Sequence, residues 1–211
     1  MTSWQPLTGA FGAIVLCGGR SSRMGIPKLS LPFGPEVMLQ RIVRIVSRIA
    51  QPVVVVAASE QDLPSLPQDV ITIRDDEAYQ GPLAGLAAGL TALQPYVTAA
   101  YASSCDVPFL EPAFVRRIYE QLNDHDLVMP QDADHHHPLA AVYRTSLAEI
   151  IRELLEAGQF RPVALLGRCR AKVIDVNELR PVDPDLRSLR NLNTREEYER
   201  ALMDAGLEYH E

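Results

Sequence analysis

Short apolar runs separated by amphipathic stretches set the pattern of this chain. The run at residues 53–58 is apolar on both faces and rich in β-branched side chains, which is typical of a central strand in a parallel sheet. Other apolar runs of similar length recur before and after it. The pattern predicts strands at residues 11–17, 53–58, 71–73, 97–104, 127–129, 139–143 and 171–176.

Between most of these runs, apolar residues recur at helical spacing. Thr194 followed by Glu197 has the spacing of a capping box at the start of the last helix, and the polar residues 131–137 predict a turn. Strands that alternate with helices predict an α/β fold in three layers, Rossmann-like, with a mainly parallel sheet and helices on both faces. Helices are predicted at residues 37–50, 82–93, 112–122, 146–157, 161–166 and 194–204.

Composition narrows the class of protein. The 211 residues, 47% apolar and 22% charged, predict one globular domain over residues 1–211. With 20 Lys and Arg against 27 Asp and Glu, the net charge is −7, which argues against nucleic acid as a partner but not against a small anionic substrate. Three cysteines without a CxxC spacing predict neither a disulfide framework nor a zinc site. Without a leader pattern or an 18-residue apolar run, we expect a cytoplasmic protein that does not cross a membrane.

The loop after the first predicted strand carries the strongest chemical signal. Gly18 and Gly19 let the backbone approach a ligand closely, and Arg23 and Lys28 add positive charge within ten residues. These residue types suit a triphosphate. The spacing is neither that of a Walker A loop nor that of a GxGxxG dinucleotide loop. The alternative is a glycine-rich turn with surface arginines.

Four further polar groups are candidates, each with a structural alternative. Asp106 ends an apolar strand, and we expect it to project into a crevice and bind Mg²⁺, or else to cap the strand end in an Asx turn. Asp75 and Asp76 end the third predicted strand and either bind a ligand or mark a turn. Asn193 is either a neutral metal ligand or the boundary of the last helix. Three consecutive histidines, 135–137, are more typical of a turn than of a metal site.

Taken together, these motifs resemble one family. The segment from Leu16 to Lys28, LCGGRSSRMGIPK, resembles the (L/A)xGGxSxRMGxxK signature of nucleotidyltransferases that activate small phosphorylated substrates. The later motifs GPLAG, CDVP, HP and NLNT follow in the order found in the molybdenum cofactor guanylyltransferases, the MobA family. The resemblance covers residues 11–205 and implies a nucleotidyltransferase fold. It also implies that GMP passes from GTP to the terminal phosphate of molybdopterin carrying molybdenum, giving a guanine dinucleotide and pyrophosphate.

The resemblance also implies roles for individual residues. Lys28, Arg23 and Asp106 would be catalytic, and Asp106 and Asn193 would hold Mg²⁺. Residues 10–110 would form a nucleotide-binding half and residues 111–205 an acceptor half, with other molybdenum cofactor proteins as possible partners. Either Asp75 or Asp76 would contact the nucleoside. The residues implied to bind the nucleotide are Leu16, Cys17, Gly18, Gly19, Arg23, Lys28, Asp75 and Asp106.

Two other functions fit the same motifs. A related cytidylyltransferase or sugar-phosphate nucleotidyltransferase would differ at the base side, where Gly18 stands in place of the alanine usual in the cytidylyl branch and so favours guanine. A nucleotide-binding module without activity would be free to lose Lys28 or Asp106, and both are present.

Overall fold

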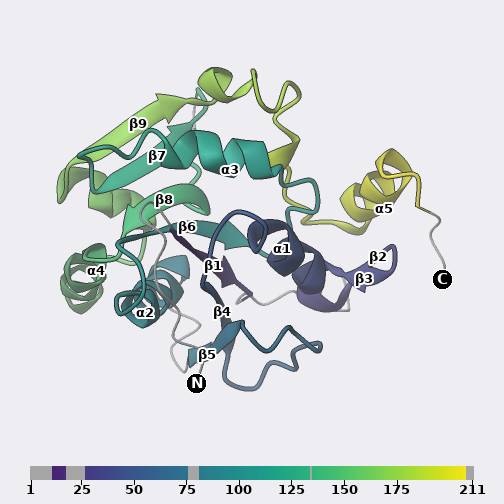
Figure 1. Cartoon of the computed structure of the whole chain (residues 1–211), viewed down its shortest axis with the longest axis horizontal. Coiled ribbons are helices and arrows are strands. Elements are labelled where there is room, and N and C mark those ends of the chain that lie inside the picture. The colour runs from purple at the N-terminus through teal and green to yellow at the C-terminus, as the bar shows by residue number, and fades with distance from the viewer. Residues whose placement is uncertain (1–10, 18–26, 76–80, 134, 208–211) are drawn as a thin grey trace.

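A seven-stranded sheet forms the centre of the computed structural model, which describes residues 11–17, 27–75, 81–133 and 135–207 (Figure 1). Its strand order is β5-β4-β1-β6-β8-β7-β9, and β8 runs antiparallel to both of its neighbours. All other neighbouring pairs are parallel, so the predicted mainly parallel sheet is confirmed. The strands are β1 Gly12–Leu16, β4 Val53–Ala58, β5 Ile71–Asp75, β6 Ala99–Ser104, β7 Leu127–Gln131, β8 Ala140–Arg144 and β9 Ala171–Asp175.

Helices cover both faces of this sheet, which gives the three layers predicted. On one face α1 (Met38–Val46) and α3 (Pro112–Tyr119) share a core with Ala13 and Val15 of β1. On the other face α2 (Pro82–Leu93) and α4 (Leu147–Glu156) share a core with Ile14 and Leu16 of the same strand. Successive residues of β1 therefore enter opposite cores, and this is why the strand is apolar at every position.

Two glycines allow α2 to lie where it does. Gly81 precedes Pro82 with a φ of 90°, a left-handed conformation that other residues rarely adopt. A Cβ on Gly89 would lie 2.7 Å from Cγ2 of Ile14, so the absence of a side chain lets the helix approach β1 closely. Gly81 thus allows the turn that starts α2, and Gly89 allows the helix to pack closely on β1.

A smaller apolar cluster joins the C-terminal helix to the rest of the molecule. The hairpin of β2 (Pro32–Phe33) and β3 (Glu36–Val37) packs against α5 (Arg195–Asp204), away from the main sheet (Figure 1). Phe33, Phe109, Leu192 and Tyr198 are buried in this cluster. This packing places the segment before α5 beside the turn that follows β6, where the Leu192 N–H donates to the Asp106 carbonyl.

The structure departs from the predicted elements in several details. Residues 161–166, predicted as an α-helix, belong to a 3₁₀ helix, η2 (Pro162–Gly167), and α1 ends at Val46 because turns replace its last predicted residues. The β2–β3 hairpin was not predicted, nor were η1 (Lys28–Ser30), η3 (Val176–Leu179) and η4 (Arg187–Leu189). Elements of two to four residues are too short to show a hydrophobic period.

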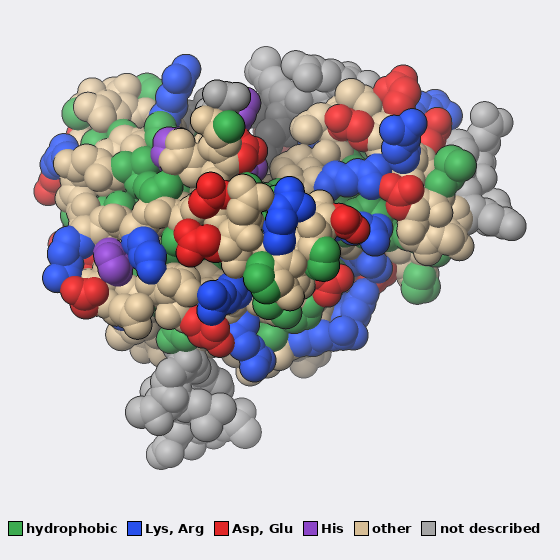
Figure 2. All heavy atoms as spheres, turned by 90° about the horizontal axis from the view of Figure 1, so that it is seen from above, with side chains coloured by type: hydrophobic (Ala, Val, Ile, Leu, Met, Phe, Trp, Pro, Cys, Tyr) green, Lys and Arg blue, Asp and Glu red, His purple; other side chains and the backbone are tan. Residues whose placement is uncertain are grey.

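The sheet runs without a break from the proposed nucleotide half into the proposed acceptor half. The antiparallel pairing of β6 with β8 joins them, so the division near residue 110 stays a prediction. In the part of the chain that the structure describes, no helix has both the length and the apolar character needed to span a bilayer. Figure 2 shows Lys and Arg side chains gathered in a band along the right-hand side of one face, although the chain is acidic overall.

Candidate active site

The candidate site lies where two central strands end. β1 and β6 are parallel and in register, with Leu16 beside Ser104. The residues that follow, Cys17 on one strand and Cys105-Asp106 on the other, therefore emerge at the same edge of the sheet. In open α/β sheets this edge is where ligands bind.

Asp106 is held at this edge by contacts to both carboxylate oxygens. Its Oδ1 accepts hydrogen bonds from Ser104 Oγ at 2.6 Å and from Asn191 Nδ2 at 2.9 Å. Its Oδ2 lies 2.6 Å from Lys28 Nζ. Asp106 is only 7% exposed, so it does not project into a crevice as an exposed carboxylate, as we expected; Ser104, Asn191 and Lys28 contact its two oxygens. Within the described part of the chain, its carboxylate contacts the Lys28 ammonium and two side-chain donors.

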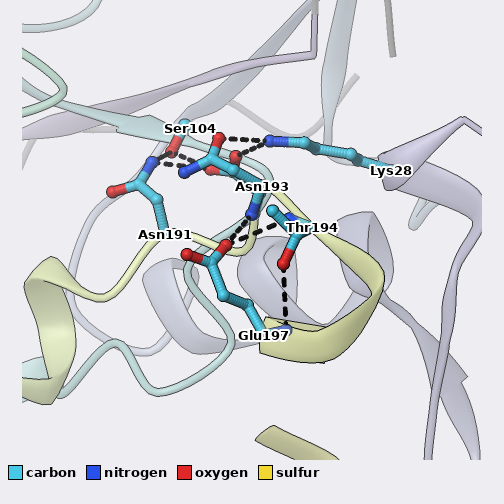
Figure 3. A network of polar contacts seen from close by, with 7 residues as sticks. Lys28, Ser104, Asn191, Asn193, Thr194 and Glu197 are labelled. Atoms are coloured by element: carbon cyan, nitrogen blue, oxygen red, sulfur yellow. Dashed lines mark hydrogen bonds and ion pairs between the residues drawn. The ribbon is translucent and has the colours of Figure 1, made fainter. Parts of the chain in front are cut away.

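Lys28 connects Asp106 to the C-terminal segment. Besides its ion pair, Lys28 Nζ donates to Asn193 Oδ1 at 2.8 Å, so the ammonium bridges two oxygens from distant parts of the chain (Figure 3). η1 supplies Lys28 directly after Pro27, and a side-chain exposure of 22% leaves it half-buried. The sequence predicted Lys28, Asp106 and Asn193 separately, and the structure brings all three together.

Asn193 is positioned by the start of α5. The Glu197 carboxylate accepts hydrogen bonds from the backbone N–H groups of Asn193 at 2.6 Å and Thr194 at 3.0 Å. In return Thr194 Oγ1 accepts from the Glu197 N–H at 3.2 Å, which confirms the predicted capping box. Leu192 N–H donates to the Asp106 carbonyl at 3.0 Å. Asn193 is therefore at once a helix boundary and a member of the site.

The end of β1 forms a second, more apolar part of the site. Leu16 and Cys17 are buried, and Cys17 lies against Cys105. The hydrogen bond between these two thiols, together with burial, raises the pKa of Cys17 well above its usual value. Cys17 is therefore a neutral thiol near pH 7 and a poor nucleophile. All three cysteines of the chain are free.

Gln61 ties this part of the site to β4. Its side-chain amide donates to the Cys17 carbonyl at 3.1 Å and accepts from the Ala58 N–H at 3.3 Å. Arg74 of β5 donates to the Ala58 carbonyl at 3.1 Å. These contacts fix the backbone from which the glycine-rich loop departs. Nothing in the sequence around Gln61 marks it for this position.

The other predicted site residues are less fully defined. Gly18, Gly19 and Arg23 lie outside the described residues. Asp75 is the last residue of β5, next to Ala58 in the sheet register, so its backbone reaches the same edge two strands away from β1. The assignment of these residues to the nucleotide stays a prediction.

Sequence reasoning missed the role of Ser104 and Asn191. Ser104 is the last residue of β6, and Asp106 lies two residues later in the turn that follows the strand. Asn191 lies in the same NLNT motif as Asn193, but only the fold shows that it meets Asp106. Both are donors to Oδ1, which leaves Oδ2 as the oxygen directed at a cation.

The donor set at this site suits Mg²⁺. Asp106 Oδ2 and Asn193 Oδ1 are hard oxygen donors converging on one ammonium. Mg²⁺ is usually held in proteins by one or two carboxylates together with substrate phosphates, rather than by a cage of side chains. Within the described ranges, no three His, Cys, Asp or Glu residues gather as a metal site. His137 of the β7–β8 turn instead contacts Asp132, with Nε2 3.2 Å from Oδ2.

Comparison with known proteins finds similarity to one family along almost the whole chain. The family model of the MobA-like NTP transferase domain matches residues 13–171. A molybdenum cofactor guanylyltransferase of Desulfosudis oleivorans is 34% identical over 195 residues, which cover 91% of this chain and 94% of that protein. A protein of Mycobacterium tuberculosis named "Probable molybdenum cofactor guanylyltransferase" is 35% identical over 199 residues, covering 92% and 94%.

Solved structures share the fold. Molybdopterin-guanine dinucleotide biosynthesis protein A from Archaeoglobus fulgidus superposes with a TM-score of 0.76 at 23% identity, over 93% of this chain and 99% of that one. The 2-C-methyl-D-erythritol 4-phosphate cytidylyltransferase from Thermus thermophilus gives a TM-score of 0.67 at 14% identity, over 93% and 100%. The α/β fold is thus shared by enzymes whose names specify different bases and acceptors.

Proposed function

The chain belongs to the family of MobA-like NTP transferase domains, and on this premise we propose that it transfers GMP from GTP to the terminal phosphate of molybdopterin carrying molybdenum. It is a nucleotidyltransferase. The products of the proposed reaction are molybdopterin guanine dinucleotide and pyrophosphate. The identity to curated guanylyltransferases over most of the chain supports guanine as the base.

One observation carries the proposal within this structure. A lysine, a carboxylate and an amide oxygen converge at the carboxyl ends of β1 and β6, with Lys28 Nζ 2.6 Å from Asp106 Oδ2 and 2.8 Å from Asn193 Oδ1. A reaction between two phosphorylated molecules needs cationic groups for their phosphates and oxygen ligands for a divalent metal. This cluster supplies both from residues far apart in the sequence.

In the proposed reaction, Lys28 and Arg23 bind the triphosphate and stabilise the charge that develops on the departing pyrophosphate. Asp106 and Asn193 hold Mg²⁺, which when bound would neutralise phosphate charge. The acceptor phosphate carries most of its second negative charge near pH 7 and attacks without a general base. Acceleration then rests on positioning and charge stabilisation by these side chains.

Recognition of the base is assigned to the end of β1. Leu16 and Cys17 present a buried, uncharged edge, and Gln61 keeps the Cys17 carbonyl in place. We propose that Leu16, Cys17 and Gly18 line the guanine and ribose, that Gly19 contacts the triphosphate, and that Asp75 or Asp76 contacts the nucleoside. The acceptor would lie along residues 111–205, in which β8 begins opposite Ser103 of β6 and the segment before α5 supplies Asn193.

The test is a turnover assay with purified protein, Mg²⁺ and molybdopterin carrying molybdenum. GTP, CTP, ATP and UTP are compared in parallel, with pyrophosphate release and the mass of the dinucleotide as readouts. We expect guanine dinucleotide from GTP, with far less product from the other three. Cytosine dinucleotide as the main product would assign the chain to the cytidylyl alternative, and no dinucleotide from any NTP would contradict the proposal.

A further inference from the structure

We infer that the Lys28 ammonium and the divalent cation of the reaction share one position, so that Lys28 must leave Asp106 and Asn193 when the metal-bound nucleotide enters. This inference rests on the proposed function and assigns a second role to Lys28. In the free protein, the lysine is a resident counter-ion at the metal ligands. In the complex, it becomes a ligand of the triphosphate.

The argument begins with the oxygens that are available. Asp106 Oδ1 already accepts hydrogen bonds from the buried Ser104 and from Asn191, which precedes α5. Oδ2 and Asn193 Oδ1 remain to receive a cation. Lys28 Nζ occupies the point at which both can be reached, 2.6 Å and 2.8 Å away.

A metal ion at these oxygens excludes the ammonium. Mg²⁺ binds oxygen at about 2.0–2.1 Å and requires near-octahedral directions around it, so it would lie in the space that Nζ now fills. Two cations within a few ångströms of each other in a half-buried site also repel strongly. The same two oxygens therefore serve either Lys28 or the metal.

Lys28 has a route out of this position. It is the first residue of η1, and its four-carbon stem lets the ammonium move while the backbone stays in place. The loop that precedes it is the one assigned to the phosphates. A nucleoside triphosphate brings several negative charges to that loop, and these replace the carboxylate as partners of the ammonium.

The exchange sets an order of binding. Without nucleotide, a metal ion must displace Lys28 from Asp106 with no new partner for the ammonium, so metal alone binds weakly. With nucleotide, the metal arrives together with the phosphates that receive Lys28. A cation therefore faces the Asp106 carboxylate both without nucleotide, when it is Lys28, and with nucleotide, when it is the metal.

The first test measures Mn²⁺ binding by electron paramagnetic resonance, with no nucleotide present. Lys28→Met frees both oxygens, and we expect its affinity for Mn²⁺ to exceed that of the unaltered protein by on the order of tenfold. The chain has only two lysines, so Lys172→Met is a matched control. Lys172 lies on the outer strand β9 and donates to Gln121, so its substitution should leave Mn²⁺ affinity unchanged.

Adding Asp106→Asn to the Lys28→Met protein should remove the gained affinity, which locates the ion at Asp106. Unchanged or weaker Mn²⁺ binding in Lys28→Met, in protein whose circular dichroism matches the unaltered chain, overturns the inference. No GTP or molybdopterin enters this measurement. Its outcome is therefore independent of whether the chain transfers GMP.

The second test needs no substitution at the site. Protein labelled with ¹³C at the lysine ε-carbons gives two lysine signals, which the Lys172→Met protein assigns. We expect the Lys28 signal to shift on addition of GTP with Mg²⁺ and to stay in place with Mg²⁺ alone at the same concentration. If GTP binds and the Lys28 signal stays in place, the exchange is overturned. If GTP does not bind at all, the result argues against the proposed function, and the Mn²⁺ measurement alone decides the exchange.

Discussion

At the scale of single residues, Asp106 shows how a buried carboxylate is prepared for one task. Two neutral donors, Ser104 and Asn191, satisfy Oδ1, while Lys28 faces Oδ2. An ionised group that is almost fully buried needs such partners, because burial without them is costly. The same contacts fix the direction in which the remaining oxygen points.

Replacing Ser104 by Ala should weaken catalysis more than stability. The loss of a hydrogen bond to a charged group is worth about 1.5–3 kcal/mol, so we expect kcat/KM to fall by roughly tenfold to a hundredfold. Ser103→Ala is the matched control, since Ser103 is also buried but donates to a backbone carbonyl. Steady-state kinetics and thermal melts of both variants decide. Equal activity in the two variants would remove the positioning role of Ser104.

Replacing Lys28 by Ala should lower both kcat and kcat/KM. Removal of one preorganised charge-stabilising donor typically costs on the order of 10²–10³ in rate, or about 2.7–4 kcal/mol. Lys28→Arg should rescue only part of this loss, because a planar fork cannot replace a point charge at the same reach. Lys172→Ala should behave like the unaltered enzyme. Unchanged kinetics in Lys28→Ala would mean that the ion pair with Asp106 is only structural.

The sequence predicted those members of the site that have a chemical signature of their own. Lys28 follows a glycine-rich loop, Asp106 ends an apolar strand and Asn193 precedes a capping box, so each stands out locally. Ser104, Asn191 and Gln61 act through residues 2 to 85 positions away. Partners of this kind follow from strand register and chain path, which a single sequence does not display.

At the scale of elements, the β2–β3 hairpin is tied to α1 by one carboxylate. Glu36 of β3 accepts hydrogen bonds from Arg41 and Arg44 of the helix. Arg44 contacts both carboxylate oxygens of Glu36. Arg44 above all holds the pKa of Glu36 below its usual value, against the opposing effect of burial. The hairpin also packs on α5, so this tie supports the helix whose first turn positions Asn193.

Glu36→Gln should therefore destabilise the protein in a pH-dependent way. Because the folded pKa is depressed, the carboxylate stabilises the fold fully above its unfolded pKa of about 4.3, and this contribution is lost as the pH falls through the lower folded pKa. We expect the variant to lose about 1 kcal/mol at pH 7 and to approach the unaltered protein near pH 3. Urea unfolding at both pH values measures this. Glu153→Gln, from an exposed pair with Arg168, is the control, and an equal loss at both pH values would contradict the account.

Strands and helices were predicted where their burial shows as a pattern of apolar residues in the sequence. β1 and β4 contact cores on both faces and are apolar throughout, and α1 has a one-sided stripe, so their existence was clear. The antiparallel direction of β8 has no counterpart in its composition. The same apolar run can pair in either direction, and the hairpin that turns it back depends on residues of the 131–139 connection.

At the scale of the whole molecule, an acidic chain is proposed to bind two polyanions. Its net charge is −7, yet Lys and Arg side chains gather on one side of the surface in Figure 2. Local fields govern the approach of a charged ligand more directly than net charge does. The proposed site adds Lys28, whose ammonium contacts the buried Asp106 carboxylate.

Ligand binding to this site should stabilise the entire domain. A ligand that binds only the folded state at 100 times its Kd adds about 2.7 kcal/mol, which for a chain of this size corresponds to roughly 5–10 °C in Tm. We expect this shift from GTP with Mg²⁺ and a clearly smaller one from CTP at the same concentration. Thermal melts over a range of nucleotide concentrations provide the comparison. Equal shifts from the two nucleotides would argue against the assignment of guanine to Leu16, Cys17 and Gly18.

The most direct measurement follows a labelled phosphorus through the reaction. GTP labelled at the α-phosphorus or at the γ-phosphorus is incubated with the protein, Mg²⁺ and molybdopterin carrying molybdenum, and the products are separated. The account predicts that the α-label enters the dinucleotide and that the γ-label leaves in pyrophosphate, with both flows reduced together in Lys28→Ala. Label from the γ-phosphorus in the acceptor, or release of inorganic phosphate without a dinucleotide, would contradict it.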